Sequence, residues 1–178
     1  MAKRKLEIWN LEFEVGVAQR YYSKRDAFFE QCHALTAILS TLLGLTAFFS
    51  VISKIPFVAA TAALLVAVLS VFDLVIGFSK KAKEYGDLYR RFSELSVKLA
   101  TLPNNASAEE VRQFDALFKS IEMDEKHRKE GLGAIVFNEE ITYRGLDKKY
   151  LRKVKIWHYP FCQVCTFPPW NFPDSTAE

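Results

Sequence analysis

Two long stretches without charge lie in the middle of the chain and limit the folds open to it. Residues 34–53 contain no charged side chain, and after Lys54 a second uncharged stretch covers residues 55–72. A helix needs about 20 mostly apolar residues to cross the hydrocarbon core of a bilayer, so each stretch is long enough. Each stretch holds ten Leu, Ile, Val or Phe residues. This pattern favours a two-helix membrane hairpin over a buried hairpin of a soluble protein.

The basic residues around the two stretches predict how the hairpin is oriented. The short turn holds one lysine, Lys54. The outer flanks hold five cations: Lys24 and Arg25 before the first stretch, and Lys80, Lys81 and Lys83 after the second. The positive-inside rule then places both termini in the cytoplasm. A cleaved signal peptide does not fit, because about 28 residues separate the basic amino terminus from the first apolar stretch.

The flanking segments carry helical patterns. Apolar residues recur three, four or seven positions apart on both sides of the hairpin: Leu6, Trp9, Phe13, Val17, Tyr21 and Phe28 before it, and Tyr85, Leu88, Phe92, Leu95 and Leu99 after it. The second series is typical of a helix-pair seam, whose natural partner is the apolar face of the amino-terminal helix. We therefore expect an all-α fold with an amphipathic helix over residues 1–33, a two-span hairpin over 34–79, a helical stalk over 80–102 and a small helical carboxyl-terminal region over 103–178.

The carboxyl-terminal region begins with a second helix signal. Pro103 and the two asparagines after it end the stalk, and Ser107 with Glu110 forms a capping-box pattern that starts another helix. We expect this helix to end near Gly131 and Gly133. Residues 134–150 fit either a helix or a short strand, and the chain becomes rich in aromatic residues and proline after residue 157.

The hairpin itself carries polar and small residues that an anchor does not need. Small residues recur every four positions, as Thr36, Ser40 and Gly44 on the first stretch and as Ala59, Ala63 and Ala67 on the second. Such stripes allow close helix packing, which indicates homo-oligomers, although the two stripes could also pack against each other within a monomer. Ser70 and Asp73 add polar groups near the end of the second stretch. Asp73 either faces a pore or a partner, or reaches water beside Lys80 or Lys81.

Two patterns near the carboxyl terminus are candidates for chemistry. Arg152 and His158, separated by five residues, fit the Arg-x4–6-His signature of HEPN ribonucleases, in which Arg stabilises a phosphate and His moves a proton. His158 with Cys162 and Cys165 offers three zinc ligands, but packing among aromatic residues is the simpler reading of these cysteines. The chain lacks the Gly-rich phosphate loop and the common hydrolase motifs, so we expect neither an enzyme nor a cofactor.

The charge and cysteine content restrict the remaining options. A net charge of +3 does not suit a strongly basic nucleic-acid binder, and three cysteines are too few for a disulfide framework and suit a reducing cytoplasm. The basic residues do cluster once, in a segment that could contact RNA or anionic lipid or simply be solvated: Lys148, Lys149, Arg152, Lys153 and Lys155.

The layout of residues 5–140 resembles the SLATT family of two-span membrane effectors from bacterial conflict and antiphage systems. The residues that carry the resemblance flank the hairpin: Arg20, Tyr21, Tyr22, Lys24 and Arg25 before it, and Tyr85, Leu88, Tyr89 and Phe92 after it. With the Arg152-x5-His158 pattern, the chain looks like the family of small accessory membrane proteins that accompany RNA-targeting type VI CRISPR nucleases. That resemblance implies an oligomeric pore that depolarises the inner membrane and enhances the response of an RNA-guided nuclease. A membrane-tethered HEPN-like ribonuclease and a non-conducting membrane adaptor are the alternatives.

Overall fold

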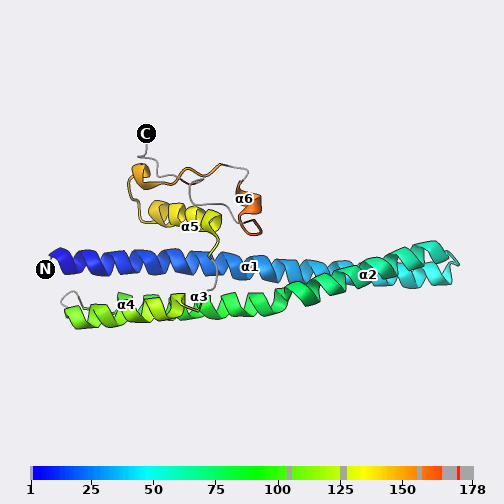
Figure 1. Ribbon diagram of the computed structural model, residues 1–178, viewed down its shortest axis with the longest axis horizontal. Helices are drawn as coiled ribbons and strands as arrows, with labels where there is room; N and C mark the ends of the chain where they lie inside the picture. Colours follow the sequence, from blue (N-terminus) through cyan, green and yellow to red (C-terminus); the bar gives the residue numbers. More distant parts are fainter. Residues whose placement is uncertain (1, 104–105, 125–127, 156–157, 166–171, 173–178) are drawn as a thin grey trace. The chain divides into compact units, whose positions relative to one another are not determined.

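The computed structural model describes residues 2–103, 106–124, 128–155, 158–165 and 172, and among these residues it contains helices and no strand. The all-α prediction is confirmed. The helices are α1 (Ala2–Ile52), α2 (Pro56–Ile76), α3 (Phe78–Ala100), α4 (Ala108–Glu122), α5 (Glu130–Tyr143), the 3₁₀ helix η1 (Lys148–Tyr150) and α6 (His158–Phe161). Figure 1 shows their order along the chain.

The chain divides into two compact units. Unit 1 contains Met1–Lys24 and Gly86–Glu178, and unit 2 contains Arg25–Tyr85. Both α1 and α3 contribute residues to each unit, because α1 continues past Lys24 and α3 begins before Gly86.

Unit 2 is a helical hairpin with a compact turn. The turn is a Schellman motif, in which the Ile55 amide donates to the Ser50 carbonyl at 2.9 Å and the Lys54 amide donates to the Val51 carbonyl at 3.1 Å. Lys54 takes the left-handed position, with φ 57°, that glycine usually occupies. Pro56 starts α2, where its missing N–H leaves no intrahelical bond unmade.

A heptad-like seam joins the two helices of the hairpin. The shielded positions recur three and four apart, at Thr36, Ser40, Leu43, Ala47 and Ser50 on α1 and at Ala59, Ala62, Val66, Leu69, Asp73 and Ile76 on α2. Among the α2 positions, Ala62 is fully buried. Such spacing is that of an antiparallel helix pair in close contact.

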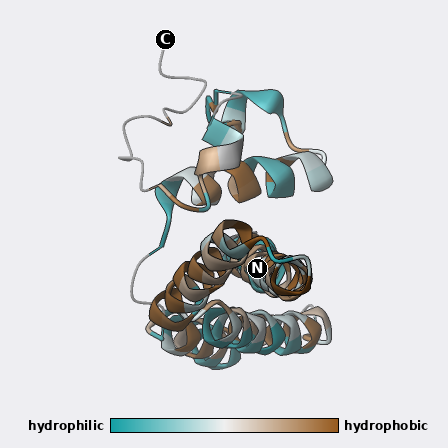
Figure 2. Ribbon diagram, turned by 90° about the vertical axis from the view of Figure 1, so that its right-hand side faces the viewer, coloured by the Kyte–Doolittle hydropathy of each residue, from teal (hydrophilic) through white to brown (hydrophobic). Residues whose placement is uncertain are grey.

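Both hairpin helices are long and apolar enough to cross a membrane, and only 6% of each apolar window is buried. A core helix of a soluble protein would bury most of such a stretch. Large apolar side chains such as Phe57, Leu74 and Val75 are exposed instead. Figure 2 shows brown, hydrophobic residues along the hairpin.

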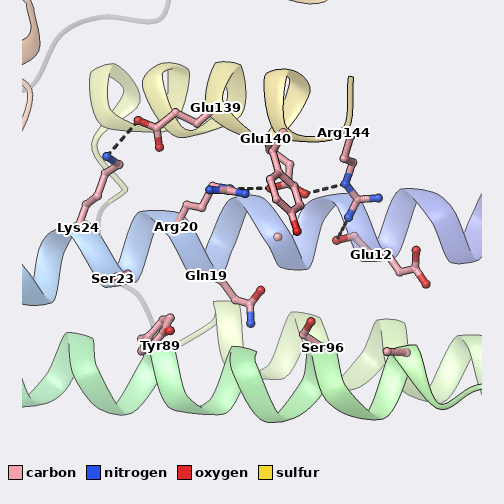
Figure 3. Close-up of a pocket in the computed structure, with 13 residues that line it drawn as sticks. Glu12, Gln19, Arg20, Ser23, Lys24, Tyr89, Ser96, Glu139, Glu140 and Arg144 are labelled. Carbon is pink, nitrogen blue, oxygen red and sulfur yellow. Dashed lines mark hydrogen bonds and ion pairs between the residues drawn. The ribbon is translucent and has the colours of Figure 1, made fainter. Parts of the chain in front are cut away.

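In unit 1, α1 lies between α5 on one side and α3 on the other (Figures 1 and 3). The predicted seam of α3 is confirmed, since Leu88, Phe92, Leu95 and Leu99 are buried. The predicted face of α1 is incomplete, because α1 packs on two sides. Tyr22 stacks on Phe92 of α3 at 5.0 Å, while the Tyr21 hydroxyl accepts a hydrogen bond from the Lys129 amide, just before α5.

The start of α4 is as predicted, but its end is not. The Glu110 amide donates to the Ser107 hydroxyl at 3.2 Å, and the Ser107 amide donates to the Glu110 carboxylate at 2.6 Å, which completes the capping box. The helix ends at Glu122, and Gly131 and Gly133 lie inside the buried first turns of α5. The physical reason is tertiary packing, which overrides the low helix propensity of glycine in these buried turns. The open segment 134–150 is helical rather than a strand, with α5 continuing to Tyr143 and η1 following at Lys148–Tyr150. Asn104 and Asn105 lie outside the described residues.

Candidate functional site

A buried carboxylate bonded to two arginines joins α5 to α1 in unit 1. Oε2 of Glu140 accepts from Nε of Arg20 at 2.7 Å, and Oε1 accepts from Nε of Arg144 at 2.6 Å. The Glu140 side chain is 3% exposed, whereas the two arginines are partly solvated. Arg144 also donates to the Glu12 carbonyl at 2.9 Å (Figure 3). Two charge-assisted bonds offset the cost of removing this carboxylate from water.

Gly16 provides the space for that carboxylate. A β-carbon at position 16 would lie 2.8 Å from Cδ of Glu140 and 3.1 Å from its Oε2. Any larger residue at position 16 would therefore displace Glu140 from its two arginines. Glycine is needed here for a close approach of two elements.

The ion pairs border a cleft of about 670 Å³ between α1, α3 and α5. Its charged lining balances, with three cationic and three carboxylate side chains: Arg20, Lys24, Arg144, Glu12, Glu139 and Glu140. Lys24 and Glu139 form a second, solvated pair at 3.0 Å (Figure 3). Because these cations are matched with carboxylates, we interpret the cleft as an ionic joint that holds α5 on α1.

Asp73, the carboxylate near the end of α2, has a partner that the sequence did not indicate. Its Oδ2 lies 3.6 Å from Nδ1 of His33, so the pair links α1 and α2 within unit 2. The expected partners are occupied elsewhere, since Lys80 lies 3.9 Å from Glu84 and the Lys81 ammonium lies 5.4 Å over the Phe29 ring. The His33 and Asp73 side chains are 47% and 33% exposed, which leaves both within reach of solvent or of another chain.

The structure divides the predicted small-residue stripes. Thr36, Ser40 and Ala59 lie in the seam of the hairpin, whereas Gly44, Ala63 and Ala67 are exposed. A β-carbon at Gly44 would meet nothing within 4 Å. The exposed small residues align as one face on each helix, Ala34, Ala37, Thr41 and Gly44 on α1 and Ala60, Ala63, Ala67 and Ser70 on α2.

Five hydroxyl groups along the hairpin are bonded within their own helices. The Thr36 hydroxyl donates to the Cys32 carbonyl at 2.9 Å, and the Ser70 hydroxyl donates to the Val66 carbonyl at the same distance. Thr41, Thr46 and Thr61 make bonds of the same kind. A hydroxyl that has donated its proton still carries lone pairs that accept from water.

The two ribonuclease candidates, Arg152 and His158, have different surroundings in the described part of the chain. Arg152 lies with its guanidinium carbon 4.5 Å from the Phe137 ring centroid, and it borders a cavity of about 450 Å³ that His158 does not line. His158 is 3% exposed and packs edge-on against Phe172 at 5.2 Å. The Arg152 backbone is held by the Asn138 side chain in two hydrogen bonds of 2.7 and 2.8 Å. Both residues therefore have structural contacts in unit 1.

The described residues contain no group of three His, Cys, Asp or Glu side chains placed to hold a metal ion, and this includes His158, Cys162 and Cys165. Cys162 is buried with its thiol donating to the Tyr159 carbonyl at 3.1 Å, while Cys165 is exposed. The zinc site stays a prediction of the sequence alone.

The basic segment is mostly solvent-facing. Lys148, Lys149, Lys153 and Lys155 are exposed, and Arg152 is partly buried. Lys149 lies 3.4 Å from Asp147 at the start of η1, and the bonds with Asp147 raise the pKa of its ammonium.

Sequence reasoning did not identify Glu140, Arg144 and Gly16, nor the pairing of His33 with Asp73. An acid and an arginine four residues apart, as in Glu140 and Arg144, were a usable signal. The chain matches no family model, no curated protein and no solved structure.

Proposed function

We propose that this chain is a membrane protein whose hairpins assemble into a homo-oligomeric pore, and that the pore acts as an effector in antiphage defence. On this proposal both termini lie in the cytoplasm of the host bacterium, and the pore depolarises the inner membrane to enhance the response of an RNA-guided nuclease. The defence role rests on the resemblance of the chain to SLATT-like and CRISPR-associated membrane proteins.

The observation that carries the pore proposal is the pair of exposed small-residue faces on the hairpin. Four small residues lie on one face of each helix, outside the seam that joins the helices. In a bilayer, lipid covers large apolar side chains well, whereas small residues favour close contact with another helix. The face that includes Gly44 on α1 and the face that includes Ala63 on α2 thus suit contacts between neighbouring copies.

Polar groups elsewhere on the exposed surface of the hairpin support conduction rather than simple assembly. Thr46 and Thr61 are exposed and lie outside the two small-residue faces. Their oxygens can accept hydrogen bonds from water along a wetted path. His33 and Asp73 together would form a ring of ionisable groups at the end of the hairpin that joins the rest of the chain.

Depolarisation is tested with a potential-sensitive dye in cells that carry the complete defence system, with and without its nucleic-acid target. We expect the potential to collapse only when the target is present. If defence proceeds with the potential intact, the chain is a non-conducting adaptor.

Purified protein in liposomes separates conduction from signalling. We expect a preference for cations that Asp73→Asn lowers, because the variant removes one negative charge per copy from the ring. Glu84→Gln is the matched control, since Glu84 is an exposed carboxylate outside the uncharged stretches and pairs with Lys80. An equal change in both variants would show that selectivity follows general surface charge and not the proposed ring.

A further inference from the structure

Three apolar side chains stand exposed around the short helix α6. Tyr159 is 51% exposed, Phe161 is 53% exposed and Val164 is 65% exposed. The segment nevertheless has a defined backbone, since the Cys162 amide donates to the His158 carbonyl at 2.9 Å and the Cys165 amide to the Phe161 carbonyl at 2.8 Å. Three exposed apolar side chains are thus held on an ordered turn.

Two lysines lie at the two ends of this segment. The Lys155 carbonyl accepts from the His158 amide at 2.9 Å, so Lys155 lies at the start of α6. Nζ of Lys129 donates to the Val164 carbonyl at 3.3 Å, which places a second cation at its end. We call these two lysines together with Tyr159, Phe161 and Val164 the α6 patch.

The surroundings of the α6 patch are cationic in sequence as well. No Asp or Glu occurs from Lys148 to Pro173. Lys148 and Lys153 are exposed in the segment that leads to α6. Exposed aromatic and aliphatic groups next to lysines match the two parts of a lipid interface, the acyl boundary and the anionic head groups.

We propose that the α6 patch docks on the head groups of an anionic bilayer, with Lys129 and Lys155 near the phosphates and the apolar side chains at the acyl boundary. Single-stranded RNA is the other anionic partner. RNA recognition favours arginine forks, whereas the exposed cations here are lysines and Arg152 lies over Phe137. Val164 also has no ring on which a base could stack.

The chain itself supports a lipid partner. The Gln163 side chain donates to the Lys24 carbonyl of α1 at 3.4 Å. Lys24 precedes the first uncharged stretch by ten residues in the sequence. The α6 segment is therefore attached to the part of unit 1 from which the chain continues toward its apolar hairpin.

The test uses the full chain in lipid nanodiscs with a fluorophore on Cys165, which is exposed, in a Cys32→Ala background. The probe is a phosphatidylcholine that carries a nitroxide quencher on its head group. We expect quenching about twofold stronger in discs containing phosphatidylglycerol than in neutral discs. Lys153→Glu with Lys155→Glu should remove the difference, while Lys98→Glu, on the exposed end of α3, should leave it.

A second pair of variants tests the apolar part in case the charge changes disturb folding. Phe161→Ser with Val164→Ser should weaken quenching in both lipids, whereas Met123→Ser, an exposed apolar residue after α4, should not. Equal quenching in both lipids that no variant changes would overturn the proposal. Lysine-dependent binding of single-stranded RNA without lipid-dependent quenching would assign the surface to RNA. Ion flux is recorded in a separate experiment. A protein that does not conduct can therefore still show lipid docking by quenching, and the two proposals can fail independently.

Discussion

The carboxylate of Glu140 occupies the space that a side chain at position 16 would fill. It reaches that space from α5, and Arg20 of α1 and Arg144 of α5 hold it there at 2.7 and 2.6 Å. The packing of α5 on α1 in unit 1 thus requires glycine at position 16, because the charged side chain of Glu140 fills the space beside it.

Gly16→Ala should destabilise the protein although it adds only one methyl group. The methyl must push Glu140 away from its arginines, and the loss of buried charge-assisted bonds costs about 3 kcal/mol. The measurement is the thermal midpoint in mild detergent, alone and combined with Glu140→Gln. We expect the double variant to lose less than the sum of the two single ones. Strict additivity would show that the glycine acts independently of Glu140.

Glu140→Gln should cost far more stability than Glu139→Gln in the neighbouring position. Glu140 is 3% exposed between two guanidiniums, whereas Glu139 is 37% exposed and forms an ion pair with Lys24. A solvated pair contributes about 0–1 kcal/mol and is screened by salt. Thermal midpoints at low and high salt check both expectations. Equal losses would mean that burial of Glu140 does not determine its contribution.

Glu14→Gln should stabilise the protein near neutral pH. Burial raises the pKa of Glu14 in the folded chain, with Glu122 and Asp115 adding repulsion. The folded state therefore holds this proton more tightly than the unfolded state, so its contribution to stability falls as pH rises above the ordinary pKa of 4.5. Because the group is partly solvated, we expect a gain below about 0.5 kcal/mol.

The control for Glu14 has the opposite sign. The amide and side chain of Ser107 bond to Glu110 and lower its pKa, so its contribution is present above the ordinary value and lost as pH falls. The difference in midpoint between wild type and Glu14→Gln should grow from pH 4 toward pH 7, and that for Glu110→Gln should shrink as pH falls. A pH-independent Glu14→Gln effect would contradict the prediction.

The parts of the fold that follow local patterns could be predicted from the sequence. The hairpin follows from two uncharged stretches, the α3 seam from a heptad-like series, and the start of α4 from Ser107 and Glu110. These signals depend on residues within a few turns of each other.

The ionic joint could not be predicted, because it depends on which helices meet. Arg20 and Glu140 are 120 positions apart, and Gly16 has no side chain that would mark a contact. The two-sided burial of α1 was missed for the same reason, since a single apolar face predicts a single partner. The divided small-residue stripes show the same limit, because Ala59 lies in the seam and Ala63 does not.

Arg152→Ala and His158→Ala should each lower the stability of the protein. We expect no RNA-cleaving activity in the wild type that these variants could remove. Arg152 would lose its contact with Phe137, and His158 would leave a cavity beside Phe172. We expect the purified protein to leave labelled RNA intact. Metal-independent fragments that vanish in both variants, while the oligomer survives, would favour the membrane-tethered HEPN-like ribonuclease instead.

Three consecutive residues on α2 separate contacts within the hairpin from contacts between copies. Ala62 is buried in the seam, Ala63 lies on the exposed small-residue face, and Leu64 is 64% exposed. Ala63→Leu should therefore weaken assembly while leaving the hairpin intact, because a bulky side chain keeps neighbouring helices apart. Ala62→Leu should disturb the hairpin itself by overpacking the seam, and Leu64→Ala should do neither.

Light scattering in detergent, with the detergent mass subtracted, gives the size of the assembly, and circular dichroism gives the helix content. Ion flux in liposomes should fall with assembly in Ala63→Leu and stay unchanged in Leu64→Ala. If Ala63→Leu assembles and conducts like wild type, copies do not meet along this face, and the pore must be built from another surface of the hairpin.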